Sequence, residues 1–288
     1  MPEIAVILPT LNERENLAPM VQRLEAALAD VAWEAIFVDD DSTDGTGDAL
    51  REIAQADPRV RVIQRIGRRG LASAVIEGAC ATAAPLIAVM DADHQHDPAL
   101  IPQMILPLQT GGADLVVASR FAEGGDADGL SSAARERGSR IANRLARMLT
   151  GVELSDPMSG FFAIHTARVR SLAPRLSGIG FKVLLDILSV SPQRLRVAEV
   201  PMHFGERRSG ESKLDRAVAF EFLVGLYDRY FGKIIPTRFA LFGTVGGAGV
   251  LVHLAVLSLF YPGMTATFWK AQAIATFAAM SFNFWLNN

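Results

Sequence analysis

The acidic segment VMDADHQHDP, residues 89–98, contains the side chains best suited to chemistry in this chain. The apolar run PLIAVM leads into Asp91 and Asp93, and Gln95 follows at the same spacing. On an extended chain, side chains two positions apart point the same way. Two carboxylates and an amide oxygen supply part of a hard-oxygen shell, which substrate phosphates complete around Mg²⁺ or Mn²⁺. We therefore predict a Mg²⁺ or Mn²⁺ site at Asp91, Asp93 and Gln95.

Two histidines in the same segment, His94 and His96, leave zinc as an alternative metal. Catalytic zinc usually has three protein ligands, often with a histidine pair spaced along a helix. In an extended chain His94 points away from Asp93. The pattern therefore favours Mg²⁺ or Mn²⁺ over zinc, and solvated turn acids without a metal are the remaining alternative.

A second acidic stretch, DDDSTDGT at residues 39–46, follows another apolar run. Its spacing from Asp40 matches the first half of a calcium-binding EF-hand loop, but Arg51 stands where a bidentate glutamate is needed. A turn closed by Asp44 and Gly45 fits the sequence better, with Asp39 and Asp40 lining a pocket. Their carboxylates can accept hydrogen bonds from a ribose or a base.

Strand-like and helix-like stretches alternate up to about residue 125, which predicts βαβ units and a mostly parallel sheet. Ligands bind such sheets at the carboxyl ends of the strands, and these ends are polar here: PTLNE, DDDSTDG, DADHQH and SRF. The G-x-G-x-x-G and G-x-x-x-x-G-K-[ST] phosphate loops are both absent from the sequence. Strands are expected at 3–10, 33–42, 59–64, 85–93 and 113–121, and helices at 15–31, 45–56 and 71–83, with a broken helix at 101–111.

Composition points to a membrane segment and excludes several classes of protein. Half of the 288 residues are hydrophobic, and the mean hydropathy is +0.24. The net charge of −3 gives no basic field for nucleic acid. The single cysteine, Cys80, excludes a disulfide framework and a cysteine zinc site. The N-terminus, MPEIAVILP, is typical of a strand rather than a signal peptide.

The C-terminal tail contains two apolar stretches. The stretch 239–261 carries no charged side chain and is long enough for a membrane span. Residues 271–286 predict a second, shorter span. Gly243 and Gly247 form a G-x-x-x-G that favours close packing with another helix and hints at a homo-oligomer. Basic residues before the first span outnumber the single Lys270 between the spans, which predicts a cytoplasmic N-terminal domain.

Seven motifs occur in order and together resemble family 2 glycosyltransferases of GT-A fold, specifically the polyprenyl (dolichol) phosphate mannosyltransferases. They are LPTLNERENL, VDDDSTDGT, RRGLASAVIEGA, DADHQHDP, SRF, DPMSGFF and RRSGESKL, and the resemblance covers residues 3–230. The tail resembles the first half of a GtrA-like membrane domain. These resemblances imply an α/β GT-A domain over 1–213, a juxtamembrane or interfacial helix over 214–235, and a two-span hairpin over 236–288. They place the protein in the inner (plasma) membrane, with the catalytic domain cytoplasmic.

The resemblance also assigns roles to individual residues. The divalent metal would bridge the donor pyrophosphate at Asp91, Asp93 and Gln95. Residues implied for the nucleotide are Pro9, Leu11, Glu13, Asp39, Asp40 and Gly70, together with the metal-site residues. Residues implied for the acceptor phosphate are Arg120, Arg135, Ser139, Arg140, Arg207, Ser212 and Lys213. The catalytic set is expected to be Asp93, Arg120, Arg207 and Lys213.

The implied reaction needs no general base, because a lipid monophosphate is largely dianionic at neutral pH. The main barrier is repulsion between the acceptor and the donor pyrophosphate, which a metal and arginines relieve. Displacement at the sugar C1 would invert the anomer. GDP-mannose is the favoured donor and UDP-glucose the alternative. A processive polysaccharide synthase would carry Q-x-x-R-W, which is absent. A non-catalytic lipid-phosphate-binding membrane module is the alternative of another class.

Overall fold

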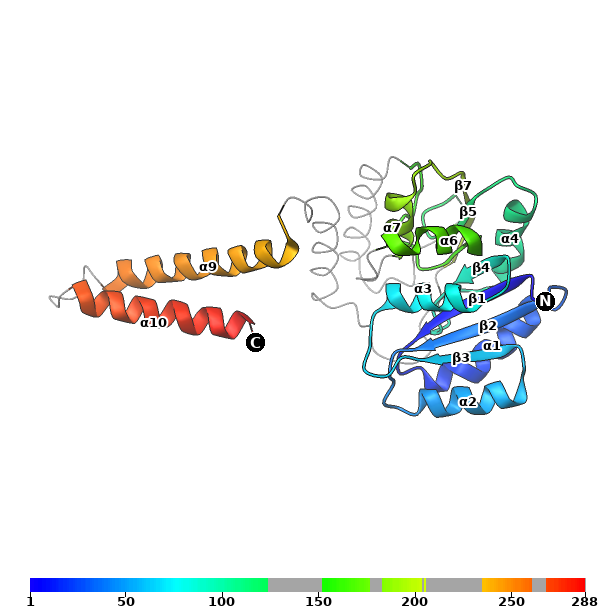
Figure 1. Cartoon of the computed structure of the whole chain (residues 1–288), viewed down its shortest axis with the longest axis horizontal. Helices are drawn as coiled ribbons and strands as arrows, with labels where there is room; N and C mark the ends of the chain where they lie inside the picture. Colours follow the sequence, from blue (N-terminus) through cyan, green and yellow to red (C-terminus); the bar gives the residue numbers. More distant parts are fainter. Residues whose placement is uncertain (124–151, 177–182, 204, 206–234, 261–267, 288) are drawn as a thin grey trace. The chain divides into compact units, whose positions relative to one another are not determined.

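The computed structural model describes residues 1–123, 152–176, 183–203, 205, 235–260 and 268–287. The chain divides into two compact units, Met1–Val218 and Ala219–Asn288 (Figure 1). Residues 214–234 of the predicted juxtamembrane helix lie outside the described residues.

Within the described residues, the first unit is built on one seven-stranded sheet with the order β3-β2-β1-β4-β6-β5-β7 (Figure 1). All neighbouring strands pair in parallel except β6, which runs antiparallel to both β4 and β5. The predicted mostly parallel α/β fold is thus confirmed. The strands are β1 (Ile4–Thr10), β2 (Trp33–Asp39), β3 (Val60–Gln64), β4 (Leu86–Val89), β5 (Leu115–Ser119), β6 (Phe162–His165) and β7 (Val197–Pro201).

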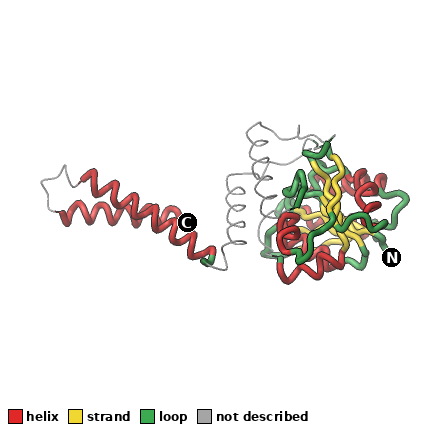
Figure 2. Tube along the Cα trace, turned by 90° about the horizontal axis from the view of Figure 1, so that it is seen from above, coloured by secondary structure: helices red, strands yellow, loops and turns green. Residues whose placement is uncertain are grey.

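Helices cover both faces of this sheet (Figure 2), so the inner strands bury apolar side chains on both faces. One core lies under α1 (Leu17–Ala27), α2 (Thr46–Ala56) and α4 (Ile101–Gln109). The other lies under α3 (Leu71–Ala81), α6 (Thr166–Leu172) and α7 (Val183–Val190). The described residues of this first unit also form three short 3₁₀ helices: η1 (Arg14–Asn16), η2 (Pro98–Leu100) and η3 (Ala173–Arg175).

Two local elements differ from the sequence expectation. The segment 101–111 was expected to be a broken helix, but α4 continues through Pro107 to Gln109. Pro107 lies close to the C-terminal end of the helix, so its missing N–H and the crowding of its ring against the preceding turn affect only the last turn. The second difference is β6, which the sequence did not predict because FAIH is too short to show a strand period.

An ion pair between Asp114 and Arg196 ties the start of β5 to the start of β7. The Arg196 Nη2 lies 2.9 Å from Asp114 Oδ1, and the Arg196 backbone N–H donates to Asp114 Oδ2 at 3.0 Å. The side-chain hydrogen bonds from Arg196, followed by the backbone one, lower the pKa of Asp114 to about 2. Because the folded-state pKa is depressed, the pair stabilises the fold above the ordinary aspartate pKa, and this is lost as the pH falls toward the folded value.

Replacing Asp114 with asparagine is expected to lower the free energy of unfolding by about 1 kcal/mol at neutral pH, a small value because Arg196 is largely exposed. Thermal unfolding of both proteins would measure this as a difference in Tm. The difference should shrink as the pH is lowered from about 5 to about 2.5. A matched control, Glu3→Gln, removes one exposed charge and should show no such trend; a pH-independent difference would contradict the role of the ion pair.

The second unit contains α9 (Thr237–Phe260) and α10 (Phe268–Asn287), which lie side by side in both views (Figures 1 and 2). Among the described helices, α9 alone is long and apolar enough to cross a membrane, over Phe239–Phe260 with a mean hydropathy of 1.9. The two helices lie close together at Gly249, where a Cβ would collide with the Asn283 side chain. A Cβ at Gly243 or Gly247 would meet no described atom within 4 Å, so that face is not used inside the hairpin.

Candidate active site

The loops at the carboxyl ends of the parallel strands form the candidate site. β1, β2, β3 and β4 pair in parallel, so the loops after them meet at one edge of the sheet. β5 runs in the same direction as β4, because β6 lies between them and is antiparallel to both. β7 is parallel to β5 and so shares this direction. The segment before β6 therefore reaches this same edge. The antiparallel strand thus brings residues 152–161 beside the acidic loop that follows β4.

The acidic loop is a compact turn, which corrects the extended geometry that the sequence suggested. β4 ends at Val89, residues 92–96 form bends, and His94 has a φ of 68°. Asp93 is buried and its Oδ1 accepts the Gln95 backbone N–H at 3.1 Å. The Asp91 side chain is 41% exposed. One carboxylate is therefore held inside the turn, and the other reaches toward solvent.

Arg23 of α1 fixes His94 inside this loop. Its Nη1 lies 3.2 Å from His94 Nδ1, and its Nη2 lies 3.0 Å from Asp97 Oδ1. A guanidinium only donates, so Nδ1 of His94 is the acceptor and Nε2 carries the proton. That proton is donated to the Asn16 carbonyl oxygen at 3.1 Å. Both ring nitrogens of His94 are thus engaged by the protein, which disfavours it as a zinc ligand.

The donor set of the acidic loop suits a hard divalent cation. Gln95 Nε2 donates to the Gly205 carbonyl at 3.3 Å, so the amide nitrogen is used for structure and the oxygen is the end left to act as a ligand. His96 Nδ1 accepts the Asp91 backbone N–H at 3.0 Å. Within the described ranges, no group of three or more His, Cys, Asp and Glu side chains could hold a metal by itself. Two carboxylates and one amide oxygen require further oxygens from a ligand.

The loops after β1 and β2 are joined by hydrogen bonds. The Asn12 backbone N–H donates to Ser42 Oγ at 2.8 Å, and the Thr43 backbone N–H donates to Asn12 Oδ1 at 3.0 Å. Asn12 has a φ of 55°, a left-handed conformation that asparagine tolerates better than most residues. Pro9 and Leu11, both half-buried, flank this junction together with Glu13. The Glu13 backbone N–H donates to Thr46 Oγ1 at 3.0 Å.

The predicted turn at Asp44 and Gly45 is confirmed. Gly45 has a φ of 87° and immediately precedes α2. Asp44 Oδ1 accepts hydrogen bonds from the Thr46 hydroxyl and backbone N–H, at 2.6 and 3.0 Å. Partial burial opposes ionisation of Asp44, but these bonds and that from the Arg14 N–H outweigh it, so its pKa is lowered. Asp44 therefore places a carboxylate just before the N-terminus of α2, where the helix dipole favours a negative charge.

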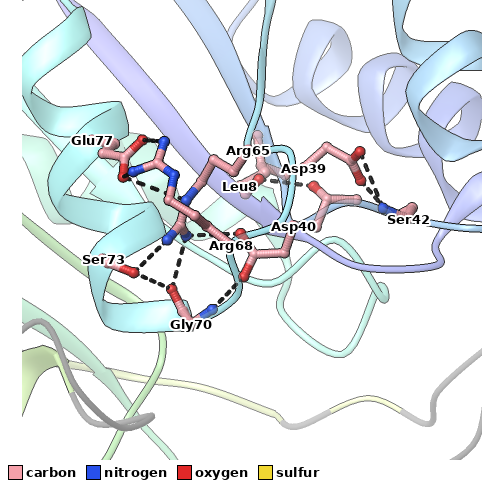
Figure 3. A network of polar contacts seen from close by, with 10 residues as sticks. Leu8, Asp39, Asp40, Ser42, Arg65, Arg68, Gly70, Ser73 and Glu77 are labelled. Carbon is pink, nitrogen blue, oxygen red and sulfur yellow. Dashed lines mark hydrogen bonds and ion pairs between the residues drawn. The ribbon is translucent and has the colours of Figure 1, made fainter.

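Asp39 and Asp40 are buried, and protein groups hold both carboxylates (Figure 3). Asp39 Oδ1 accepts the Ser42 hydroxyl at 2.5 Å. Asp40 Oδ1 accepts from Arg65 Nη1 at 2.7 Å, and Asp40 Oδ2 accepts from the Gly70 backbone N–H at 2.6 Å. The predicted nucleotide residues Asp40 and Gly70 are thus in direct contact. Arg65 completes this contact, and the sequence did not single it out.

Arg120 follows β5 and is held by Asp156, in the segment before β6. Arg120 Nε lies 2.7 Å from Asp156 Oδ2, and Nη2 lies 3.1 Å from Oδ1. Asp156 is fully buried. A bidentate pair of this kind fixes the plane of the guanidinium. Asp156 belongs to the motif DPMSGFF, which is one of the seven motifs that carry the family resemblance. The sequence predicted no role for Asp156 itself.

Six predicted acceptor-phosphate residues lie outside the described residues: Arg135, Ser139, Arg140, Arg207, Ser212 and Lys213. Of that predicted set, the structure describes Arg120 only. Their convergence with Arg120 therefore stays a prediction.

Comparison with known proteins gives two family matches. The profile described as glycosyl transferase family 2 matches residues 5–170, and the profile described as GtrA/DPMS, transmembrane domain, matches residues 241–288. The chain therefore carries a membrane segment after its α/β unit.

Curated proteins resemble the chain over most of its length. It is 37% identical to a dolichol-phosphate mannosyltransferase of Pyrococcus furiosus, over 90% of this chain and 72% of the relative. It is 38% identical to a dolichol-phosphate mannosyltransferase of Mycosarcoma maydis, over 90% of this chain and 87% of the relative. An undecaprenyl-phosphate mannosyltransferase of Micrococcus luteus is 32% identical over 77% of this chain and 92% of that protein.

A solved structure is also similar. Glucosyl-3-phosphoglycerate synthase of Mycobacterium tuberculosis, in complex with Mn²⁺, UDP-glucose and phosphoglyceric acid, superposes with a TM-score of 0.53. The two are 25% identical, and the match covers 79% of each chain.

Proposed function

Because this chain belongs to glycosyl transferase family 2 and is a glycosyltransferase, we propose that it transfers mannose from GDP-mannose to a polyprenyl monophosphate. One observation carries the proposal: two groups of side chains emerge at the same edge of the sheet. They are the acidic loop with Asp91, Asp93 and Gln95, and the ion pair between Arg120 and Asp156. Oxygen ligands there suit a metal-bound pyrophosphate, and a fixed guanidinium suits a second phosphate. The mannosyl and polyprenyl-phosphate specificity is taken from the curated relatives, which also disfavour a non-catalytic membrane module.

A divalent cation, Mg²⁺ or Mn²⁺, would be held by Asp91, Asp93 and Gln95. When bound, it would neutralise charge on the donor pyrophosphate as the leaving group departs. The proposal is supported by the oxygen-only donor set of the loop and by the Mn²⁺ complex of the solved structural relative. The loops at residues 9–13 and 39–42, together with Gly70, would hold the nucleotide.

The acceptor phosphate would act as the nucleophile without a general base, since its second pKa is near 6. One phosphate oxygen forms a bond to C1 of the sugar while the bond from C1 to the nucleoside diphosphate breaks, which inverts the anomer. Arg120 would orient the acceptor phosphate and reduce its repulsion from the donor. Two like unit charges about 4 Å apart repel by about 4 kcal/mol at an effective dielectric of 20, so this reduction is substantial.

The site would lie on the cytoplasmic side of the inner membrane, with α9 and α10 as a multi-pass anchor. Support comes from the GtrA/DPMS transmembrane profile over 241–288 and from the apolar span of α9. More basic residues precede α9 than separate it from α10, as expected for a cytoplasmic N-terminal unit.

A transfer assay tests the function. The full chain in detergent would be supplied with a short polyprenyl phosphate, Mg²⁺ or Mn²⁺, and radiolabelled GDP-mannose or UDP-glucose in parallel. We expect lipid-extractable label from GDP-mannose that is lost with EDTA and restored by added metal. Label from UDP-glucose instead would show that the donor is UDP-glucose and not GDP-mannose; the structural relative was solved with UDP-glucose bound. Label that persists in EDTA would reject the metal, and no label from either donor would reject the proposed reaction.

A further inference from the structure

We propose that Arg65 is a positioning residue for the donor nucleotide: it joins the loop after β2 to the loop before α3 and so sets the shape of the pocket. The inference rests on the proposed function in so far as that function places the nucleotide at these two loops. Arg65 itself is assigned no contact with the substrate.

Arg65 is buried as completely as an apolar core residue, with 2% of its surface exposed. Few arginines are found at such burial unless they are paired. Its Nη1 donates to Asp40 Oδ1 at 2.7 Å and to the Gly70 carbonyl at 3.0 Å, and its Nη2 donates to Ser73 Oγ at 2.5 Å (Figure 3). Its Nε lies 3.4 Å from Glu77 Oε1, an ion-pair distance without hydrogen-bond geometry.

These contacts close a ring around the turn at Gly70. Asp40 receives Arg65 on one oxygen and the Gly70 N–H on the other, while Arg65 also donates to the Gly70 carbonyl. Gly70 has a φ of 140°, a conformation that residues with a Cβ rarely adopt. The ring therefore fixes glycine, a residue with many accessible conformations, in one backbone conformation at the start of α3.

Neighbouring contacts extend the same connection. The Gly67 backbone N–H donates to Asp41 Oδ2 at 3.1 Å, and the Arg65 backbone N–H donates to the Asp39 carbonyl at 2.9 Å. Arg68 forms a two-point contact with Glu77, at 2.8 and 3.1 Å. The loop over 65–70 is thus attached to β2 on one side and to α3 on the other. A change at Arg65 would shift Asp40 and Gly70 together.

Only arginine can make this set of contacts. Its planar guanidinium donates in several fixed directions, whereas the lysine ammonium is a compact point charge on a flexible stem. Arg65→Lys retains a positive charge beside buried Asp40 but loses the simultaneous bonds to Gly70 and Ser73. This variant therefore distinguishes two roles of Arg65: holding the two loops in position, and neutralising the charge of Asp40. It also lowers the risk that an unpaired buried charge unfolds the protein.

The test compares Arg65→Lys with Arg61→Lys in the full chain. Arg61 lies on β3, which Arg65 directly follows; it is 45% exposed and pairs with Glu34, so Arg61→Lys controls for the loss of a guanidinium in this part of the chain. We expect Arg65→Lys to raise the KM for the donor and the Kd for the free nucleoside diphosphate roughly tenfold, the lower range for a lost supporting contact. The kcat and the KM for the polyprenyl phosphate should stay within about twofold of the parent, because the substitution weakens donor binding equally in the ground state and in the transition state.

A second readout is independent of turnover. Hydrogen exchange of backbone amides over residues 65–73 should accelerate in Arg65→Lys and stay unchanged in Arg61→Lys, and bound nucleotide should restore part of the protection. A purely structural role would lower Tm without changing the ratio of donor KM to acceptor KM.

The outcomes separate the two proposals. If the parent transfers sugar and Arg65→Lys has the parent's donor KM, the inference is wrong and the proposed function stands. If no donor supports transfer but Arg65→Lys weakens binding of GDP or UDP, the function is wrong and the inference stands. If neither nucleotide binds the parent protein, both are rejected.

Discussion

Replacing Asp93 with asparagine is expected to reduce sugar transfer on the order of 10³-fold, as for the loss of one preorganised charge-stabilising group. The physical reason is the loss of one negative charge from the proposed metal site. Asparagine keeps an oxygen where Asp93 Oδ1 accepts the Gln95 N–H, so the turn should be preserved. The measurement is kcat at saturating donor, with circular dichroism and Tm to show that the protein remains folded.

Asp97→Asn is the matched control for this prediction. Asp97 lies in the same loop, but it pairs with Arg23 and its Oδ1 accepts the Ala99 N–H at the start of η2. Asparagine is also an effective cap, so this variant removes one charge and retains the local structure. We expect it to keep most of the activity and an unchanged metal requirement. Equal loss in the two variants, or full activity of Asp93→Asn, would show that Asp93 has no special role in holding the metal.

Replacing Asp156 with asparagine is expected to impair both the acceptor step and the stability of the first unit. Asp156 is fully buried and holds Arg120 by two hydrogen bonds. Removing one partner of a buried ion pair leaves the other charge uncompensated, which typically costs about 3–5 kcal/mol. We expect a Tm lowered by several degrees and a kcat/KM for the polyprenyl phosphate reduced by about 10²-fold, since a misplaced group loses catalytic orientation.

A double-mutant cycle with Arg120→Gln distinguishes the two effects. If Asp156 acts through Arg120, the double variant should lose little more acceptor kcat/KM than Arg120→Gln alone, a coupling of about 1–3 kcal/mol. The matched control is Asp114→Asn, which removes an arginine-bound aspartate from the opposite end of the same strand. It should lower Tm without changing the KM for the lipid. Additive effects of Asp156→Asn and Arg120→Gln on kcat/KM would reject the positioning of Arg120.

Local pattern was sufficient to predict much of the fold. Apolar runs identified β1 to β5, and the Asp44-Gly45 turn was correctly placed because side-chain capping and a positive φ act within a few residues. The strand order and the antiparallel β6 depend on pairings between distant segments. No local propensity specifies those pairings, and FAIH alone carries too few residues to show a period.

The candidate site divides in the same way. The sequence by itself determined which carboxylates and arginines are available and that they follow strand ends, because charge after a buried strand is visible in the residue order. Only the tertiary structure decided which of them meet. Arg65 reaches Asp40 across 25 positions, and Arg120 reaches Asp156 across 36. Such pairs form because burying a charge without a partner is costly, and the partner can come from any strand that the sheet brings to the same edge.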